Sequence, residues 1–503
     1  MSGTCIVQAP VSVYQYNNNG ERLIGEDCCV RLHNTGNFTF TFDIIEGSTV
    51  ILSADIVSAL NLQFSLADLT LYFDIRFKSK LHNLKLIFHS VDDLRRYINI
   101  FVNSLFEHAN KNRVSASDIP DIDNYIESLS LDNQNTELND DDDIFDDDEQ
   151  AGGNRNTDGG HNFLLRVGPR TDNTMVMRKY NNHCDLGLFT NDRDCQFRMA
   201  LPTISDESNQ ALSANDMLTN NNDHGLFVLD NQRPYEVFNL NLDRGMVVNH
   251  LDAIDSSNQQ QRVDHILHTN YGDSSAPTFV GFNNRNTMLF DTRVDKPIVN
   301  RSDYKTDNKF TCGVTTRTGR FAMGSDKGIV RLYKEPCKTR ATVNFQVNIG
   351  DDPIIGLDVS PDEQWIVATC PYYVSVFTVL ARSTGKLAFD APMKQDKSPV
   401  TRLTISQRDQ QRIAQVNGGD LLPFTSAKFE SKNGKVVAIV ASMGNALISW
   451  NFRAIENNRK PQYSITFISG EAIIDNQPFD QTSDILYMSP NQVSVAQRQQ
   501  RRH

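Results

Sequence analysis

Short runs of alternating apolar and polar residues fill the first ninety positions of the chain. The clearest run covers residues 69–78, with Leu69, Leu71, Phe73, Ile75 and Phe77 on one side and Thr70, Asp74, Arg76 and Lys78 on the other. Because successive side chains of a strand point to opposite faces, this run predicts a strand with one face on a core. Turn residues, for example at positions 17–20, separate the runs and indicate about seven strands.

An amphipathic helix is predicted directly after these strands. Ser90 is a suitable N-cap, and Asp92 and Asp93 place negative charge in the first turn. Apolar residues then recur at spacings of three and four as far as Ala109. Several strands followed by one helix is the element order of pleckstrin-homology-like (PH-like) domains, in which the helix closes an open end of a bent antiparallel sheet. We therefore expect a PH-like domain over residues 1–112.

The periodic pattern stops between residues 113 and 161, where acidic residues accumulate. Residues 114–154 hold fourteen Asp or Glu and no Lys or Arg. This composition predicts a disordered acidic linker, most simply a solubilising spacer. A sharper hypothesis is that Ile144 and Phe145, framed by acids, form a short motif for a basic, apolar groove on another protein. Residues 497–503 are basic and predict a frayed tail.

Beyond residue 162 one unit recurs: an apolar strand, a tight turn, and a second strand that ends in an aromatic residue. The terminal aromatics are Phe238, Phe290, Tyr333, Phe377 and Trp450, and the middle three lie 43 and 44 residues apart. A repeat of about 40–45 residues with four strands per unit is typical of a β-propeller blade. With residues 163–199 before these units and 463–495 after them, the pattern predicts a mainly β chain with a WD40-like propeller over residues 162–496. We expect about seven blades, with six and eight as alternatives.

Residues 350–370 carry the most specific local pattern: a Gly-Asp-Pro entry with one extra Asp, a paired-isoleucine strand, a serine turn and a strand led by Trp365. Together with residues 304–333, 424–429 and 450–452, this stretch resembles the family of vacuolar import and degradation protein twenty-seven. The resemblance implies a cytoplasmic propeller with a PH-like region before it, associated with vacuolar turnover. It implies no reaction.

Charge and cysteine content narrow the function classes. The net charge is −13, but without the acidic segment 49 basic residues face 48 acidic ones, so bulk charge gives no case for nucleic-acid binding. The eight cysteines show no CxxC spacing, which favours reduced thiols over disulfides or zinc. The N-terminus lacks a basic and apolar leader, and no window approaches eighteen uninterrupted apolar residues. We expect a cytoplasmic protein.

Motifs for catalysis, metals or cofactors are weak. The chain contains no GxSxG, HExxH, P-loop or dinucleotide fingerprint, so we expect no enzyme activity, cofactor or metal. His265 and His268 could be combined with His183, Cys184 and Cys195 into a metal site, but a spacing of three does not share a face on a strand. Residues 324–328 could pass for a phosphate loop, yet their place between strands predicts a hairpin turn.

One charged feature remains in the first domain. Arg76, Lys78, Lys80 and His82 alternate along one extended segment, with Lys85 nearby. They predict a positive stripe that is either a solvated strand face or a weak site for an anionic membrane surface. The acidic linker could mask this stripe, although screening over about 10 Å makes such masking weak.

The sequence thus favours a non-catalytic cytoplasmic scaffold for protein partners, and the family resemblance implies a role in vacuolar or lysosomal import and degradation of cytosolic proteins. A peripheral membrane adaptor that uses Arg76, Lys78, Lys80 and Lys85 is the alternative.

Overall fold

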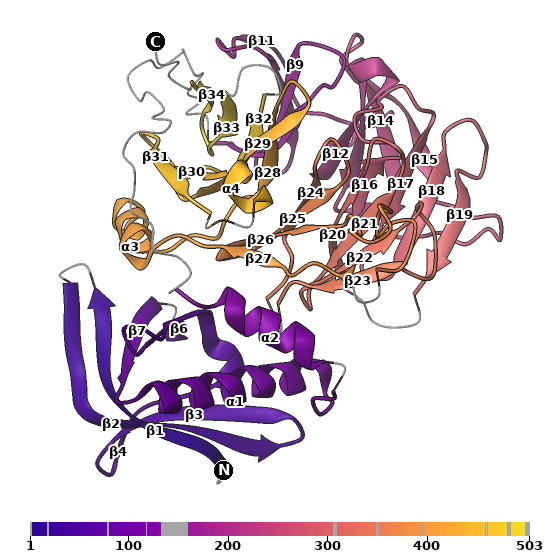
Figure 1. Cartoon of the computed structure of the whole chain (residues 1–503). Helices are drawn as coiled ribbons and strands as arrows, with labels where there is room; N and C mark the ends of the chain where they lie inside the picture. Colours follow the sequence, from indigo (N-terminus) through magenta and orange to yellow (C-terminus); the bar gives the residue numbers. More distant parts are fainter. Residues whose placement is uncertain are drawn as a thin grey trace.

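The computed structural model describes residues 3–17, 20–77, 80–116, 118–131, 159–304, 309–348, 352–393, 396–457, 459, 461–479 and 484–497. These residues form a sheet-and-helix domain at the N-terminal end and a ring of small sheets beside it (Figure 1).

The first domain is one seven-stranded antiparallel sheet closed by a helix. Its strands are β1 (Thr4–Asn17), β2 (Gly20–Gly36), β3 (Thr39–Glu46), β4 (Thr49–Asp55), β5 (Ala59–Ser65), β6 (Thr70–Phe77) and β7 (Lys80–Phe88), in the order β4-β3-β2-β1-β7-β6-β5. The 3-10 turn η1 (Ile56–Ser58) precedes β5, and α1 (Val91–Asn110) follows β7. Ser90 caps α1 by accepting a hydrogen bond from the Asp93 amide at 3.1 Å. The predicted PH-like element order is confirmed.

Aromatic rings join the sheet of this domain to α1. Phe42 on β3 lies edge-on to Phe73 of β6 at 5.5 Å and to Phe101 of α1 at 6.1 Å between centroids. Tyr97 of α1 lies beside Phe88, with ring centroids 5.6 Å apart. All of these side chains are buried, so the apolar face predicted for residues 69–78 covers the core, as expected.

The predicted linker contains a helix. α2 (Ile119–Ser128) packs against α1, and Leu129 and Leu131 exchange backbone hydrogen bonds with Phe64 on the edge strand β5. Ile122, Tyr125 and Leu129 join the core of the first domain because their spacing of three and four gives the helix one apolar face. The expectation of disorder for the whole of residues 113–161 is therefore wrong for this stretch. The high acidic content of the whole segment predicted disorder and hid the short helical period at its start. Residues 132–158 lie outside the described residues.

Seven antiparallel sheets follow. Blade one holds β8 (His161–Val167), β9 (Asn173–Lys179), β10 (Cys184–Thr190) and β11 (Phe197–Leu201), and blade two holds β12 (Ala214–Asn220), β13 (Gly225–Asp230), β14 (Arg233–Asn241) and β15 (Met246–Asp252). The short turn η3 (Asn221–Asp223) joins β12 to β13. Blade three holds β16 (His265–His268), β17 (Thr278–Phe282), β18 (Asn286–Asp291) and β19 (Ile298–Asp303), and blade four holds β20 (Phe310–Thr315), β21 (Phe321–Ser325), β22 (Ile329–Tyr333) and β23 (Val343–Gln346).

The remaining blades carry the insertions. Blade five holds β24 (Gly356–Val359), β25 (Trp365–Cys370), β26 (Tyr373–Thr378) and β27 (Thr401–Leu403), and blade six holds β28 (Lys428–Lys432), β29 (Lys435–Met443), β30 (Ala446–Asn451) and β31 (Tyr463–Phe467). The described part of blade seven holds β32 (Asp475–Pro478), β33 (Ile485–Met488) and β34 (Val493–Ala496). Helix α3 (Gln407–Val416) connects blades five and six, and α4 (Phe452–Glu456) follows β30. The predicted propeller is confirmed, with seven blades.

The ring closes by contact between its first and last blades. The innermost strands touch in chain order, and β32 of blade seven lies against β8 of blade one. At this junction the Asn162 amide donates to the carbonyl of Pro490 at 2.8 Å, and its side-chain amide donates to the carbonyl of Ser489 at 3.0 Å. Arg193 of blade one pairs with the fully buried carboxylate of Asp484 at 2.6 Å. These polar contacts and a buried apolar cluster that joins Leu165 and Val176 to Leu486 and Val495 therefore hold this seam.

The recurring aromatics occupy equivalent places. Phe238, Phe290, Tyr333, Phe377 and Trp450 all lie on the third strand of their blades and are at most 1% exposed. The long interval before Trp450 arises from the connection between β26 and β27 and from α3. Residues 463–467, which the sequence placed in the last unit, form the fourth strand of blade six instead. Gly328 adopts a φ of +66° in the β21–β22 turn, as predicted for a hairpin.

Candidate functional site

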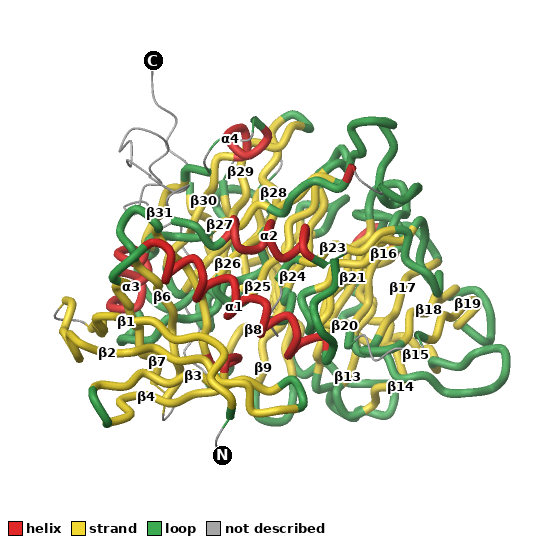
Figure 2. The backbone as a smooth tube through the Cα atoms, turned by 60° about the horizontal axis from the view of Figure 1, so that its bottom comes forward, coloured by secondary structure: helices red, strands yellow, loops and turns green. Residues whose placement is uncertain are grey.

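Helix α2 has one side on the first domain and the other on the propeller. Its apolar residues belong to the core of the first domain, whereas Asp121 contacts Lys397 in the connection that leads to β27. The Asp121 carboxylate lies 3.1 Å and 3.4 Å from Nζ of Lys397 through its two oxygens. Figures 1 and 2 both show α2 beside β27, the outermost strand of blade five. The helix thus joins the two domains.

Two cations of the propeller face this helix, and each is held over an aromatic ring of the propeller itself. Nζ of Lys397 lies 5.4 Å from the ring centroid of Phe345, on the outer strand β23 of blade four. The guanidinium carbon of Arg402 on β27 lies 3.6 Å from the ring centroid of Tyr373 on β26. Cation–π contact orients both charges without help from α2. We call these four residues the blade-five cation surface.

Tyr125 of α2 covers Arg402. Burial raises the pKa of Tyr125 to about 12, and a hydrogen bond from the Arg402 guanidinium acts in the opposite direction. Arg402 is only 6% exposed, yet its Nε and Nη1 have no hydrogen-bond partner within the described part of the chain. The nearby carboxylate of Asp352 accepts a hydrogen bond from the Tyr373 hydroxyl at 3.1 Å. The guanidinium therefore receives one neutral partner from the first domain and keeps two buried donors unmatched.

A second contact between the domains involves amide side chains. Asn61 donates from Nδ2 to Oε1 of Gln410 on α3 at 3.0 Å, and Gln410 in turn donates to the carbonyl of Ile405 at 3.1 Å. Asn61 adopts a φ of +52° at an irregularity in the pairing of β5 with β6. Asparagine tolerates this left-handed conformation better than most residues, and such irregularities re-aim side chains.

Behind Asn61 lies a buried carboxyl group. Asp74 accepts hydrogen bonds from Asn83 at 2.7 Å and from Asn61 at 3.3 Å, and burial raises its pKa to about 7. Asp74 and Thr70 are 4% and 2% exposed, although both lie on the side of β6 opposite the core. This side of the strand therefore faces protein and not solvent.

The contact between the domains is polar throughout these residues. The Asp121–Lys397 pair keeps 41% and 27% of its side chains exposed, and partly exposed ion pairs contribute about 0.2–1 kcal/mol. Neutral amide hydrogen bonds contribute about 0.5–1.5 kcal/mol each. Such a surface can orient the first domain on the propeller and can also release it.

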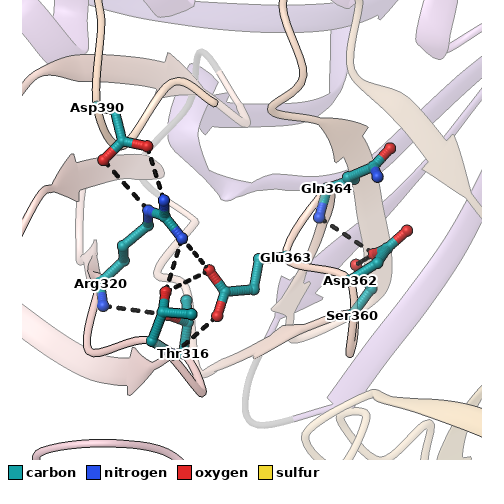
Figure 3. Close-up of polar contacts among 8 residues, drawn as sticks. Thr316, Arg320, Ser360, Asp362, Glu363, Gln364 and Asp390 are labelled. Carbon is teal, nitrogen blue, oxygen red and sulfur yellow. Dashed lines mark hydrogen bonds and ion pairs between the residues drawn. The ribbon is translucent and has the colours of Figure 1, made fainter. Parts of the chain in front are cut away.

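A different polar cluster links blades four and five, at the turns between first and second strands. The Arg320 guanidinium donates to Asp390 at 2.8 Å and 3.2 Å and also pairs with Glu363 (Figure 3). Glu363 accepts from the Thr318 amide at 2.9 Å and from its hydroxyl at 2.7 Å. Burial alone would raise the pKa of Glu363, but these hydrogen bonds hold it below its ordinary value.

The same device recurs between blades one and two. Asp223 accepts hydrogen bonds from the backbone amides of Arg170 at 2.6 Å and Thr171 at 2.9 Å. Asp223 and Glu363 both adopt left-handed φ values, +67° and +60°. In each case a carboxylate in one blade's turn fixes the turn of the preceding blade, which identifies both clusters as braces of the ring.

Charged side chains also lie on the innermost strands. Arg166 on β8 pairs with Asp216 on β12 at 2.8 Å, and Asp216 lies 3.7 Å from Nδ1 of His265 on β16. Asp216 is 5% exposed and also accepts from the Ile266 amide at 3.1 Å. Because its oxygens bind three neighbouring blades together, Asp216 serves the ring and is not an open reactive group.

The histidines and cysteines considered for a metal site have other contacts. His268 donates from Nε2 to the carbonyl of Thr219 at 2.7 Å, and His183 stacks on Tyr180 at 4.5 Å between ring centroids. Within the described ranges, no three His, Cys, Asp or Glu side chains are grouped to hold a metal ion. Cys184 and Cys195 are buried free thiols, and burial raises the pKa of each.

Comparison with known proteins settles the family. A family model described as the VID27 C-terminal WD40-like domain matches residues 160–503. The chain belongs to the VID27 family. It is 26% identical over 353 residues to "Vacuolar import and degradation protein 27" of Schizosaccharomyces pombe (strain 972 / ATCC 24843), covering 67% of this chain and 42% of that protein. It is 23% identical over 542 residues to the protein of the same name from Saccharomyces cerevisiae (strain ATCC 204508 / S288c), covering 98% and 67%.

This chain therefore spans 42% and 67% of the lengths of these two relatives. Two solved propellers are also similar: the Cps50 (Swd1) propeller domain of Myceliophteria thermophila, with a TM-score of 0.47 and 11% identity, and the WD40 propeller domain of Doa1, with 0.45 and 12%. They cover 68% and 70% of this chain, and the matches cover 98% and 97% of those domains.

The VID27 match begins one residue before β8 and includes all seven blades. The stretch around residues 350–370, which carried the resemblance in the sequence, leads into β24 and forms β25 of blade five. Tyr373 of the blade-five cation surface comes three residues later. The first domain and α2 precede the matched region.

The predicted positive stripe falls at the turn between β6 and β7. The chain reverses between β6 and β7, so that Arg76 pairs with Leu81 and Phe77 pairs with Lys80. The side chains of Arg76 and Lys80 lie outside the described residues, so a basic surface formed by them stays a prediction. The expectation of one continuous extended segment was wrong at this turn. Lys78 lies outside the described residues.

Lys85 has its own partners. Its ammonium lies 3.0 Å from Glu21 and 5.8 Å from the ring centroids of Tyr14 and Tyr72. The other sequence-derived motif, Ile144 and Phe145, lies outside the described residues. None of the described helices is long and apolar enough to cross a membrane.

Sequence reasoning missed the residues that join the domains. The apolar spacing of Ile122, Tyr125 and Leu129 could have predicted α2, since three and four is a helical period. Lys397 and Arg402 gave no local signal because they lie in a long connection and in a three-residue strand. Their orientation toward α2 depends on the aromatic rings of Phe345 on β23 and Tyr373 on β26.

Proposed function

We propose that this chain is a non-catalytic cytoplasmic scaffold that presents its propeller to protein partners during vacuolar or lysosomal import and degradation of cytosolic proteins. The observation that carries this proposal is the closed seven-blade ring in a chain of the VID27 family. A ring of this kind offers rigid turns at both ends and outer strands along its circumference, on which partners can bind without chemistry.

Several observations support the individual parts. Both relatives carry the words vacuolar import and degradation in their names. All eight cysteines are free thiols, as in proteins of reducing compartments. Phe197 and Met199 on β11, the outer strand of blade one, are 46% and 41% exposed, which is the kind of apolar surface that protein partners cover.

Anionic lipid binding by the first domain has less support. Of the basic residues proposed for it, Lys85 is engaged by Glu21, and Arg76 and Lys80 belong to two strands joined by a chain reversal and not to one extended segment. We therefore propose protein partners as the main ligands.

The test is the turnover of cytosolic proteins in cells that express this chain. Pulse labelling and mass spectrometry would compare cells with the chain, cells without it, and cells that re-express it. We expect slower delivery of a set of cytosolic proteins to the vacuole or lysosome without the chain, and recovery on re-expression. In-cell cross-linking should place partner contacts on propeller turns or outer strands. Unchanged turnover, or cross-links confined to lipids, would contradict the proposal.

A further inference from the structure

The contact between α2 and blade five has the features of an occupied binding site. The four residues of the blade-five cation surface (Phe345, Tyr373, Lys397 and Arg402) all belong to the propeller, and each cation rests on a ring of the propeller. Contacts within the propeller therefore orient both charges of this surface. Oriented charges cost less conformational entropy when a ligand binds.

The spacing of the two cations matches one face of a helix. Lys397 takes the carboxylate of Asp121, and Arg402 takes the side chain of Tyr125, four residues later. Residues four apart on a helix lie on the same side, about 5–6 Å from each other. The surface thus contacts side chains at positions i and i+4 of the helix that packs beside β27.

Helix α2 satisfies only one of these two positions with a charge. Tyr125 offers a neutral hydroxyl to Arg402. Arg402 is only 6% exposed, yet its Nε and Nη1 have no hydrogen-bond partner among the described residues. A carboxylate there would accept two parallel, charge-assisted hydrogen bonds from the guanidinium. The site therefore fits a ligand more acidic than the helix that occupies it.

We propose that the blade-five cation surface is a docking site for an acidic helix of a protein partner that carries carboxylates at positions i and i+4, and that α2 occupies this site until the partner displaces it. Displacement releases the first domain as a body, because the apolar side of α2 stays in that domain's core. The hydrogen bond from Asn61 to Gln410 is one further contact that must break. This inference concerns a surface and a partner chemistry, and it holds whatever pathway the scaffold serves.

The experiment measures fluorescence anisotropy of a labelled synthetic peptide on the full chain. The probe has the sequence of residues 118–131 with Y125E, so that it carries carboxylates at both positions. The matched control peptide has Asn and Gln at those positions. In the protein, D121K places a lysine opposite Lys397 and favours release of α2. We expect the acidic probe to bind the D121K chain at least tenfold more tightly than the wild-type chain, and the neutral peptide to bind neither.

Variants of the surface complete the test. K397A changes a partly exposed side chain, so it should fold normally, and combined with D121K it should weaken binding of the acidic probe at least tenfold. R402A should do the same. The control R412A removes another arginine held over a ring, 4.6 Å from the Phe467 centroid, and should leave binding unchanged. Thermal melting of each variant would identify any that does not fold. If R402A does not fold, binding by K397A alone decides whether the surface holds the peptide.

Three outcomes would overturn the proposal. The first is equal binding of the acidic and neutral peptides, and the second is equal binding to the wild-type and D121K chains. The third is binding of the D121K chain to phosphatidylserine vesicles, lost in K397A, with no binding of the peptide. That result would assign the surface to a membrane.

Discussion

Glu363 offers a direct test of how neighbouring blades hold together. Its carboxylate accepts two hydrogen bonds from Thr318 and pairs with Arg320, while Arg320 retains Asp390 (Figure 3). Glu363→Ala removes all three contacts, while Thr318 is exposed and Arg320 keeps its pair with Asp390, so the freed donors can bind water. Both residues have a Cβ, so the left-handed φ of +60° costs the same in either case. Any change in stability therefore reports the carboxylate.

The expected loss follows from the contacts. Hydrogen bonds to a charged group contribute about 1.5–3 kcal/mol each. Because the contacts share one carboxylate and their donors stay accessible to water or to Asp390, they do not add, and we expect a loss of about 1.5–3 kcal/mol for opening of this turn. The neighbouring Asp362→Ala is the matched control, since Asp362 is exposed and bonds only within its own turn, to Ser360 and Gln364. It should cost about 0.5–1 kcal/mol.

Native-state hydrogen exchange at the Thr318 amide measures this loss directly, because that amide donates to Glu363 at 2.9 Å. At about 1.4 kcal/mol per tenfold, exchange in Glu363→Ala should be about 10- to 100-fold faster. The lowered pKa of Glu363 sets the pH dependence. Its stabilisation is complete above the ordinary value of 4.5 and is lost as the pH falls below it. Equal exchange rates in the two variants would refute the brace.

Two further substitutions test the packing and the first domain. Trp450 is fully buried and its Nε1 has no partner among the described residues, so Trp450→Ala should cost about 3–5 kcal/mol in chemical unfolding whereas Trp450→Phe should cost much less. A large loss in both variants would mean that the indole nitrogen has an important bond. Asp74 has a folded-state pKa of about 7 against an ordinary 3.8, so the fold favours the protonated form and loses stability as the pH rises from about 4 to 7. Asp74→Asn should remove this component from the pH dependence of the melting temperature, and identical profiles for the two proteins would contradict the raised pKa.

The propeller could be predicted because its signal repeats. The same structural position in five blades holds an aromatic residue: Phe238, Phe290, Tyr333, Phe377 and Trp450. The repeat could therefore be recognised even though α3 lengthens one interval. The PH-like domain could be predicted from the alternation along β6 and the periodic spacing in α1. Both signals are local in the chain and need no knowledge of tertiary contacts.

The domain contact could not be predicted in the same way. Lys397 and Arg402 form the contact surface only because Phe345 and Tyr373, on other strands, hold their charges in place. The single extended segment expected for residues 76–82 was wrong because alternation fixes faces only within one strand, and the chain reverses between Phe77 and Lys80. Charge averaging likewise concealed α2, whose apolar face is short. Side-chain partners across strands and domains are the part that periodicity does not encode.

Zero-length cross-linking with a carbodiimide tests most directly whether α2 joins the first domain to blade five. The reagent couples a carboxylate to an amine in contact, and Asp121 lies 3.1 Å from Nζ of Lys397. The pair of Lys85 with Glu21, 3.0 Å apart within the first domain, is the internal positive control. Mass spectrometry of the full chain should find the 121–397 cross-link, and Lys397→Arg should abolish it while the control link persists. Recovery of the Lys85–Glu21 link without any link between residues 121 and 397 would contradict the account.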